Sequence, residues 1–148
     1  MSVLVRKMKG ADITDWIIMR RQLWDDISDT NHRKEMGDLL SSNTSCAYIA
    51  LGENDDLAGF AEVSIRDYAN GCTHQPVPFL EGIWVSSDHR RQGVGGMLIE
   101  AITAEMRSQG YKELCSDADD QNLDSHRAHE DWGFEETERV IYFRKPLT

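Results

Sequence analysis

The sequence is poor in cysteine and has no long apolar run, and both shortages exclude classes of protein. Its three cysteines, Cys46, Cys72 and Cys115, are an odd number without paired spacing, which argues against a disulfide framework and for a reducing compartment. No stretch approaches the ~20 apolar residues of a membrane helix, and residues 1–10 lack the apolar core of a signal peptide. We therefore expect a cytoplasmic protein with no membrane partner.

Basic residues are scarce as well. Sixteen lysines and arginines stand against 26 aspartates and glutamates, which gives a formal net charge of −10. Such a surface repels nucleic acid, whose binding proteins carry basic patches, so we expect no nucleic-acid partner. The acidity would attract cationic ligands, although an acidity that serves only solubility explains the same composition.

The length of 148 residues and the hydrophobic share of 40% fit one globular domain spanning residues 1–148. Apolar patterns predict helices at 12–26, 31–41, 93–106 and 122–132, and strands at 2–9, 46–51, 57–68, 79–85, 112–116 and 140–144. The order is a helical pair, a meander of strands, and then alternating strands and helices. It predicts an α/β fold in which helices flank a single central mixed sheet.

A glycine-rich segment, Arg90-Arg91-Gln92-Gly93-Val94-Gly95-Gly96, follows the apolar strand at 79–85 and opens the next helix. A helix start has unpaired N–H groups and a partial positive charge, and glycines let a phosphate approach the backbone. The spacing fits neither a P-loop nor a dinucleotide fingerprint. With two arginines on an otherwise acidic protein, the segment predicts a site for an anionic cofactor. The alternative is a tight turn before a helix that tolerates glycine.

The pattern Arg90-x-x-Gly93-x-Gly95 after a strand resembles the signature of the GNAT (GCN5-related N-acetyltransferase) superfamily. The order of elements along the whole chain is similar too. The resemblance implies a GNAT-type acyltransferase fold that uses acetyl-coenzyme A and no metal. It also implies that the pyrophosphate is held by backbone amides, which in this sequence belong to Gln92, Gly93, Val94, Gly95, Gly96 and Met97. We expect Arg90 or Arg91 to assist them, and an N–H near Val85 to polarise the thioester carbonyl.

Three segments, 69–72, 79–83 and 133–139, are more narrowly similar to aminoglycoside 6′-N-acetyltransferases. This resemblance implies a cationic acceptor, the 6′-amine of an aminoglycoside, and hence an antibiotic-resistance phenotype. It also implies a homodimer.

Glu81 is the only acidic residue in the apolar strand 79–85. Because burying an unpaired carboxylate is costly, such a residue is normally paired, exposed or functional. As a base, Glu81 would take the proton that a protonated amine must lose before it attacks a thioester. The matching glutamate of the similar enzymes lies at the substrate site. The alternative is a structural pair with a base such as Arg66.

Asp117 follows the predicted strand at 112–116, where open sheets place ligands. A carboxylate there would bind an amine by charge-assisted hydrogen bonds, and the resemblance implies a substrate or base role for Asp117. Asp119 and Asp120 are equally well explained as helix-capping residues.

The predicted helix at 122–132 carries Asn122, His126 and His129 at helical spacing. The resemblance implies that Asn122 contacts the cofactor, and that the position of His129 holds the acid that protonates the departing thiolate. The family often has a tyrosine at that position, where this sequence has a histidine. Tyr142 is a second candidate for this acid. The histidines could also form a solvated helix face. We expect no metal site here, because no third ligand follows them at a suitable spacing.

Trp24, Asp67 and Tyr68 are weaker candidates for the acceptor pocket, because ammonium groups and sugars favour aromatic faces. Trp24 fits a core position equally well, since it shares a helical stripe with Trp16. Cys115 has apolar neighbours and is expected to be an inert thiol rather than an acetyl carrier.

The sequence therefore predicts direct transfer of acetyl from acetyl-coenzyme A to an aminoglycoside amine in a ternary complex. Two alternatives stay open. One is a GNAT enzyme of another small amine, polyamine or peptide, and the other is a coenzyme A-binding module without catalysis.

Overall fold

The structure is a computed structural model in which residues 2–148 are described. The chain divides into two compact units, one reaching as far as Asp117 and the other comprising Ala118–Thr148. The expectation of one domain spanning residues 1–148 stays a prediction. None of the helices in residues 2–148 has both the length and the apolar character needed to cross a membrane.

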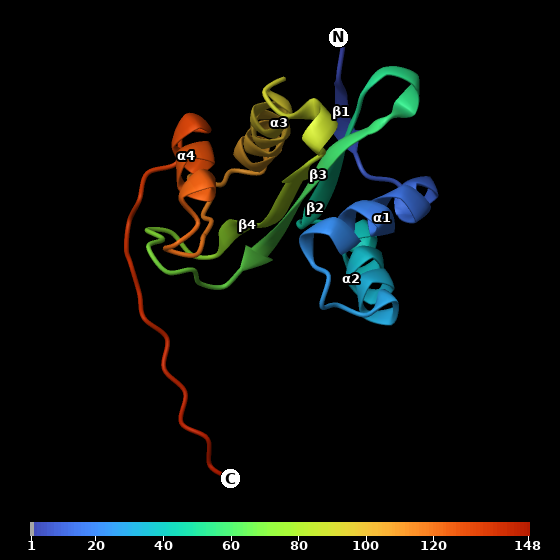
Figure 1. Ribbon diagram of the computed structural model, residues 1–148. Helices are drawn as coiled ribbons and strands as arrows, with labels where there is room; N and C mark the ends of the chain where they lie inside the picture. Colours follow the sequence, from blue (N-terminus) through green and yellow to red (C-terminus); the bar gives the residue numbers. More distant parts are fainter. Residues whose placement is uncertain (1) are drawn as a thin grey trace. The chain divides into compact units, whose positions relative to one another are not determined.

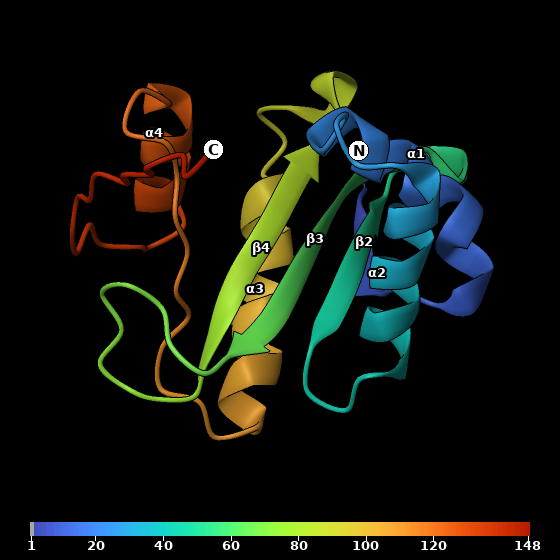
Figure 2. The same cartoon turned by 90° about the horizontal axis from the view of Figure 1, so that it is seen from below.

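The first unit is built on an antiparallel sheet with the strand order β1-β2-β3-β4. The strands are β1 (Leu4–Lys7), β2 (Cys46–Leu51), β3 (Leu57–Arg66) and β4 (Val77–Val85). Helices α1 (Ile13–Leu23) and α2 (Asp29–Ser41) cover one face of the sheet, and α3 (Val94–Ser108) covers the other (Figures 1 and 2). Short 3-10 turns occur at η1 (Gly10–Asp12), η2 (Glu53–Asp55) and η3 (Ser87–His89). This three-layer α/β arrangement confirms the predicted class.

The predicted strand at 112–116 is reduced to one bridging residue. Cys115 lies parallel to Phe79 at the outer edge of β4. The Leu80 amide donates to the Cys115 carbonyl at 2.8 Å, and the Cys115 amide donates to the Pro78 carbonyl at 2.9 Å. The bridge adds a parallel element to an antiparallel sheet, and β4 has no partner on this side beyond Leu80 among the described residues.

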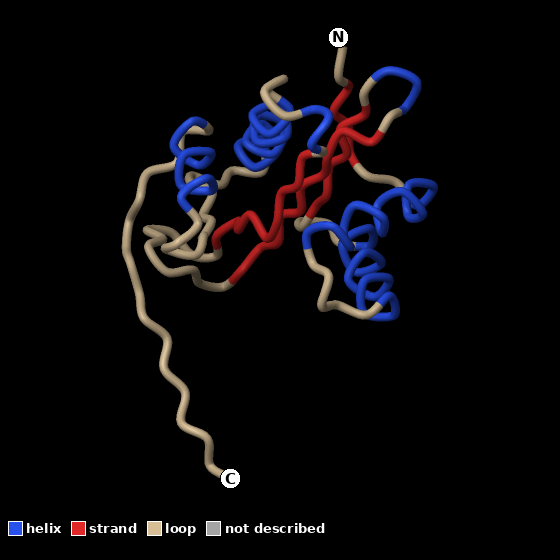
Figure 3. Tube along the Cα trace, in the orientation of Figure 1, coloured by secondary structure: helices blue, strands red, loops and turns tan. Residues whose placement is uncertain are grey.

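The second unit contains helix α4 (Leu123–Asp131) followed by an extended segment. The predicted strand at 140–144 is wrong, because this segment has no regular secondary structure (Figure 3). Its apolar side chains are open to solvent: Ile141 is 80% exposed, Tyr142 79% and Phe143 91%. A strand needs a neighbouring backbone for its hydrogen bonds, and the described chain supplies none here.

The face of the sheet beneath α1 and α2 buries a polar network inside an apolar cluster. Arg20 of α1 is 1% exposed and donates from Nε and Nη2 to both oxygens of Glu62, at 2.7 and 2.9 Å. Glu62 also accepts from the Trp16 indole at 2.9 Å. His32 Nδ1 lies 2.8 Å from Arg20 Nη1, and it must accept there because a guanidinium only donates. The network joins α1 and α2 to β3 and fixes the helical layer over β4.

Candidate active site

The fourth strand carries a β-bulge at the position of Glu81. Glu62 of β3 pairs with Gly82, whereas the next residue, Val63, pairs with Leu80, so Glu81 is the extra residue of β4. A bulge bends its strand and redirects a side chain. Here it turns Glu81 toward Ser64 and Arg66, which share the α1 face with Glu62 because side chains alternate along β3.

The Glu81 carboxylate is held by an arginine and a hydroxyl. Arg66 donates from Nε to Oε2 and from Nη2 to Oε1, both at 2.8 Å, and the Ser64 hydroxyl donates to Oε2. Half-burial opposes ionisation of Glu81, but these donors outweigh it and the pKa of Glu81 lies below its usual value. The pair with Arg66, expected as an alternative, is therefore observed. Glu81 is an anion at neutral pH and retains a proton poorly.

Trp24, the residue that follows α1, covers β4 next to Glu81. A β-carbon built on Gly82 would lie 2.6 Å from Cη2 of Trp24 and 2.8 Å from Cδ2 of Leu23. The indole also packs edge-on against Phe60, with ring centroids 6.1 Å apart, and Arg20 lies 4.7 Å from its centroid. Trp24 is only partly buried, so it combines the predicted core contact with a position beside the candidate base.

Asp117 follows the bridge to β4. Phe79 and Cys115 are parallel partners, and Glu81 and Asp117 each come two residues after the bridging residue of their own segment. Asp117, Asp67 and Tyr68 are all exposed. Burial raises the pKa of the Cys115 thiol to about 11, and this agrees with an inert thiol rather than a nucleophile.

The glycine-rich segment forms a tight turn into α3. Arg91 and Gly93 adopt positive φ angles of 65° and 75°, and such turns direct successive N–H groups toward one side. The first helical bond is donated by the Met97 amide to the Gly93 carbonyl at 3.0 Å. The amides of residues 92–96 therefore come before the first hydrogen bond of α3. The Met97 amide, which was expected to bind the pyrophosphate, already donates to the Gly93 carbonyl.

The amide of Val85 points away from β3. Ser86 donates its N–H to the Ala58 carbonyl at 2.8 Å, toward β3. Successive N–H groups of a strand point to opposite edges. That of Val85 therefore points to the outer edge of β4, which is unpaired beyond Leu80 in the described chain.

Candidates in the second unit have local structural partners. Asn122 caps α4, its side-chain oxygen accepting from the Ser125 amide at 3.1 Å. His126 Nε2 donates to the Asp119 carbonyl at 2.9 Å, and His129 Nδ1 donates to the Ser125 carbonyl at 2.7 Å. The roles of Asn122, His129 and Tyr142 in binding or catalysis stay predictions.

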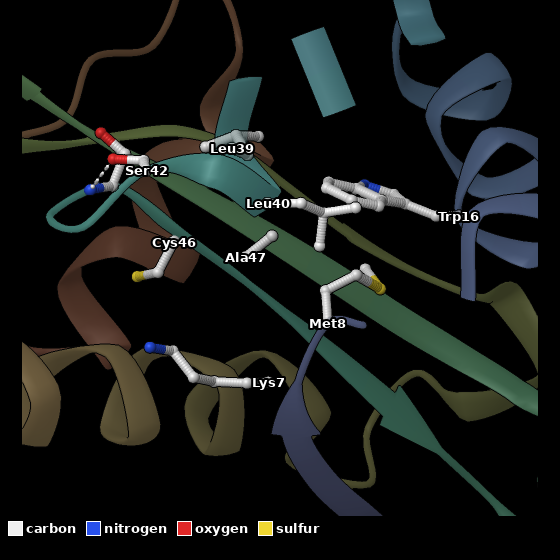
Figure 4. Close-up of a pocket in the computed structure, with 9 residues that line it drawn as sticks. Lys7, Met8, Trp16, Leu39, Leu40, Ser42, Cys46 and Ala47 are labelled. Carbon is white, nitrogen blue, oxygen red and sulfur yellow. Dashed lines mark hydrogen bonds between the residues drawn. The ribbon is translucent and has the colours of Figure 1, made fainter. Parts of the chain in front are cut away.

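Two cavities are lined by none of these candidate residues. One, of about 120 Å³, is shown in Figure 4 and is lined by Lys7, Met8, Trp16, Leu39, Leu40, Ser42, Ser45, Cys46 and Ala47. The other lies beside the η2 turn and is lined by Glu53, Asn54, Asp56 and His89. Residues 2–148 contain no group of three His, Cys, Asp or Glu side chains placed to hold a metal ion.

Sequence reasoning missed Ser64 and the close approach of Gly82 to Trp24. A signal for Ser64 was present, since Glu62, Ser64 and Arg66 are polar at every second position of an otherwise apolar strand. The bulge, which brings Glu81 onto the same face, has no sequence signal of its own.

Comparisons with known proteins identify the family. A sequence profile of the Acetyltransferase (GNAT) family matches residues 14–134. An aminoglycoside N(6′)-acetyltransferase type 1 of Serratia marcescens is 45% identical over 133 residues, covering 89% of this chain and 91% of the relative. One of Stenotrophomonas maltophilia is 40% identical over 144 residues, covering 97% and 93%.

Solved structures give the same result. The aminoglycoside acetyltransferase AAC(6′)-Iy, in complex with the bisubstrate analogue CoA-S-monomethyl-acetylneamine, has a TM-score of 0.92 and 36% identity. It covers 99% of this chain and 100% of its own. AAC(6′)-Ih from Acinetobacter baumannii has a TM-score of 0.90 and 33% identity, with the same coverage. The chain therefore belongs to the GNAT acetyltransferase family, in which it is similar to the aminoglycoside 6′-N-acetyltransferases.

Proposed function

We propose that this protein transfers the acetyl group of acetyl-coenzyme A to the 6′-amine of an aminoglycoside. The observation that carries the proposal is the arrangement along β4. One strand supplies the anionic Glu81, then the outward amide of Val85, and leads into the glycine-rich start of α3. The relatives named for this activity match nearly the whole chain.

The cofactor side of the site consists mainly of backbone. Amides from Gln92 to Gly96 precede the hydrogen-bond ladder of α3 and would donate to the diphosphate, assisted by the partial positive charge of the helix. Arg90 and Arg91 are exposed on the same turn. The thioester would lie along the open edge of β4, where the Val85 amide donates to the carbonyl oxygen as negative charge develops on it.

The acceptor side is anionic and partly aromatic. Glu81 and Asp117 each follow a residue of the parallel bridge by two positions, and Trp24 covers the strand at Gly82. A polycationic aminoglycoside would place one ammonium group at these carboxylates by charge-assisted hydrogen bonds. Asp67 and Tyr68, exposed after β3, would extend this surface.

The reaction needs no covalent enzyme intermediate. The bound ammonium gives a proton to Glu81, assisted by Asp117, and the proton passes to solvent because Glu81 retains it poorly. The freed nitrogen lone pair attacks the thioester carbon and a C–N bond forms. The nitrogen, now positively charged, releases a second proton to solvent through Glu81 as the C–S bond breaks. The leaving thiolate takes a proton from His129 or Tyr142, which is then reprotonated from solvent. Because His129 Nδ1 donates to a carbonyl, a proton given to the thiolate would come from Nε2 of His129.

We further propose that the enzyme is a cytoplasmic homodimer. Free thiols such as Cys46, Cys72 and Cys115 persist in a reducing compartment. The exposed apolar segment 140–143 has the composition of a strand and is without a neighbour in the described chain. Pairing it with a second copy would satisfy its backbone and cover its side chains.

A thiol-release assay tests the activity. The protein is given acetyl-coenzyme A with neamine, with an analogue bearing a hydroxyl in place of the 6′-amine, or with a panel of polyamines and peptides. We expect thiol release with neamine and none with the hydroxyl analogue. Equal turnover of both, or turnover only of another amine, would reject the acceptor, and coenzyme A binding without any turnover would indicate a non-catalytic module.

A further inference from the structure

Arg66 and Ser64 together occupy most of the Glu81 carboxylate. Oε2 accepts from Arg66 Nε at 2.8 Å and from the Ser64 hydroxyl, and Oε1 accepts from Arg66 Nη2 at 2.8 Å. A carboxylate offers about four lone-pair positions, two on each oxygen. Three are filled, so one position, on Oε1, remains for a further donor.

Arg66 is itself fixed by an aromatic ring. Its guanidinium carbon lies 3.7 Å from the centroid of Phe79, a buried residue of β4. Phe79 is also the residue that pairs with Cys115 in the parallel bridge. A planar guanidinium that stacks on a ring and donates through two nitrogens has one orientation, and a lysine could not reproduce it.

We propose that Arg66 is a positioning residue of the transfer reaction, holding the Glu81 carboxylate so that a single acceptor position on Oε1 receives the substrate ammonium. The inference rests on the proposed function and deepens it. It explains why a surface-accessible cation stands beside a site for a cationic substrate. Without Arg66 the carboxylate could rotate and offer either oxygen, and the amine would no longer be aimed at the thioester.

The charged surroundings of Glu81 are few. On β3 they are Arg66, which bonds to Glu81 together with the uncharged Ser64, and the carboxylate of Glu62, which shares their face of the sheet and is paired with Arg20. Asp117 comes two residues after Cys115, the bridging partner of Phe79. The residues of the α1 end that pack on neighbouring Gly82 are Leu23 and Trp24, which are uncharged. Arg66 is thus the one cation with a direct bond to Glu81 among the described residues. It also keeps the pKa of Glu81 low, so its removal must change the acid side of the rate profile.

The test compares kcat and KM across pH for Arg66→Met, Arg66→Lys and Ser64→Ala. Dividing each profile by the wild-type profile cancels the titration of the substrate amine. For Arg66→Met we expect turnover to fall on the order of 10-fold to 100-fold, as for a misaimed reacting group. The ratio of its rate to the wild-type rate should decline further as the pH falls, because Glu81 without Arg66 is protonated at a higher pH than in the wild type. For Arg66→Lys we expect lower turnover, but a ratio to the wild-type rate that hardly changes with pH. Lysine keeps the positive charge and loses the contact through two nitrogens.

Arg21→Met is the matched control. Arg21 makes the same two-nitrogen contact with Asp29, at 3.0 and 2.5 Å, on the exposed face of α1. The Arg21→Met variant should have a rate close to that of the wild type at every pH. Thermal unfolding and the KM for acetyl-coenzyme A are measured for each variant. Should Arg66→Met fold poorly, Ser64→Ala, which removes one donor to Oε2, should show the same direction of change with a smaller size.

Three outcomes separate the ideas. If the wild type acetylates neamine and the Arg66 variants lose turnover with the expected pH dependence, the positioning role stands. If the wild type is active and Arg66→Met has a flat ratio, or loses only thermal stability, the role of Arg66 is rejected while the function survives. If the wild type acetylates no aminoglycoside, the proposed function has failed, and this inference fails with it.

Discussion

Gly82 and Trp24 are in contact across the interface between β4 and the end of α1. A β-carbon on Gly82 would come within 2.6 Å of the Trp24 ring atom Cη2, a distance at which one of the two must move. Since Gly82 follows Glu81 directly, the glycine sets how closely the indole approaches the candidate base.

Substituting Gly82→Ala should therefore displace Trp24 and disturb the acceptor side of the site. We expect a KM for the aminoglycoside raised about tenfold or more, since a shift of 1 Å or less can carry this cost. The affinity for acetyl-coenzyme A should not change. Initial-rate kinetics with each substrate varied in turn distinguish the two effects.

Gly37→Ala in α2 is the control for that variant. Nothing lies within 4 Å of the β-carbon it would add, so the change should stabilise the helix by about 0.5–1 kcal/mol and leave both KM values unaltered. A Gly82→Ala enzyme with wild-type kinetics would show that Trp24 does not shape the acceptor site.

Gly93→Ala should weaken cofactor binding. Gly93 has a φ of 75° before α3 with open space around it, so alanine would strain the turn by about 1–2 kcal/mol and shift the amides of the loop. Gly110→Ala meets the same strain at a φ of 90°, beyond the other end of α3, also without a clash. Calorimetric titration with coenzyme A should show weaker binding for Gly93→Ala alone. An equal affinity in both variants would contradict a role for this loop in binding.

Glu62→Gln should destabilise the fold strongly. It would leave the buried Arg20 charge without its partner, and breaking a buried ion pair costs about 3–5 kcal/mol. Glu35→Gln should lower the free energy of unfolding by only about 0–1 kcal/mol, because Glu35, the second partner of Arg20 at 3.3 Å, is half-exposed. Urea unfolding measures both variants. Similar losses in the two would mean that the network does not anchor α1.

Asp12 should make the fold sensitive to acid. Arg6 donates to both of its oxygens, at 2.8 and 2.9 Å, and lowers the pKa of Asp12 below its usual 3.8. A lowered pKa contributes stability that is fully present above the unfolded value and is lost as pH falls through the folded value. Wild-type stability should thus drop as pH falls through about 4 and below. Asp12→Asn should show a shallower slope in unfolding experiments over this range, and an identical slope would contradict the assignment.

The sequence predicted most elements of the first unit because their signals are local. The amphipathic pattern of α3 and the apolar run of β4 depend on near neighbours alone, and both occur within two residues of their predicted starts. The prediction of a strand at 140–144 failed because an apolar alternating pattern identifies a segment that could pair. The pattern does not supply the neighbouring backbone with which it would pair.

The candidate site shows the same division. The glycine-rich turn could be recognised because its φ angles and free amides are properties of one short segment. The contacts of Glu81 could not, because they depend on a one-residue bulge that decides which face of the sheet the carboxylate occupies. The same holds for Arg20 and Glu62, which are 42 residues apart and meet only in the folded core.

The central claim is that backbone amides at the start of α3 hold the diphosphate of acetyl-coenzyme A. Calorimetric titration with acetyl-coenzyme A, and with acetyl-pantetheine, which carries the same thioester without the diphosphate and the nucleotide attached to it, tests it most directly. The account predicts binding at least about a hundredfold weaker for acetyl-pantetheine, because two or more charge-assisted hydrogen bonds of about 1.5–3 kcal/mol each are lost. Equal affinities for the two compounds would contradict it.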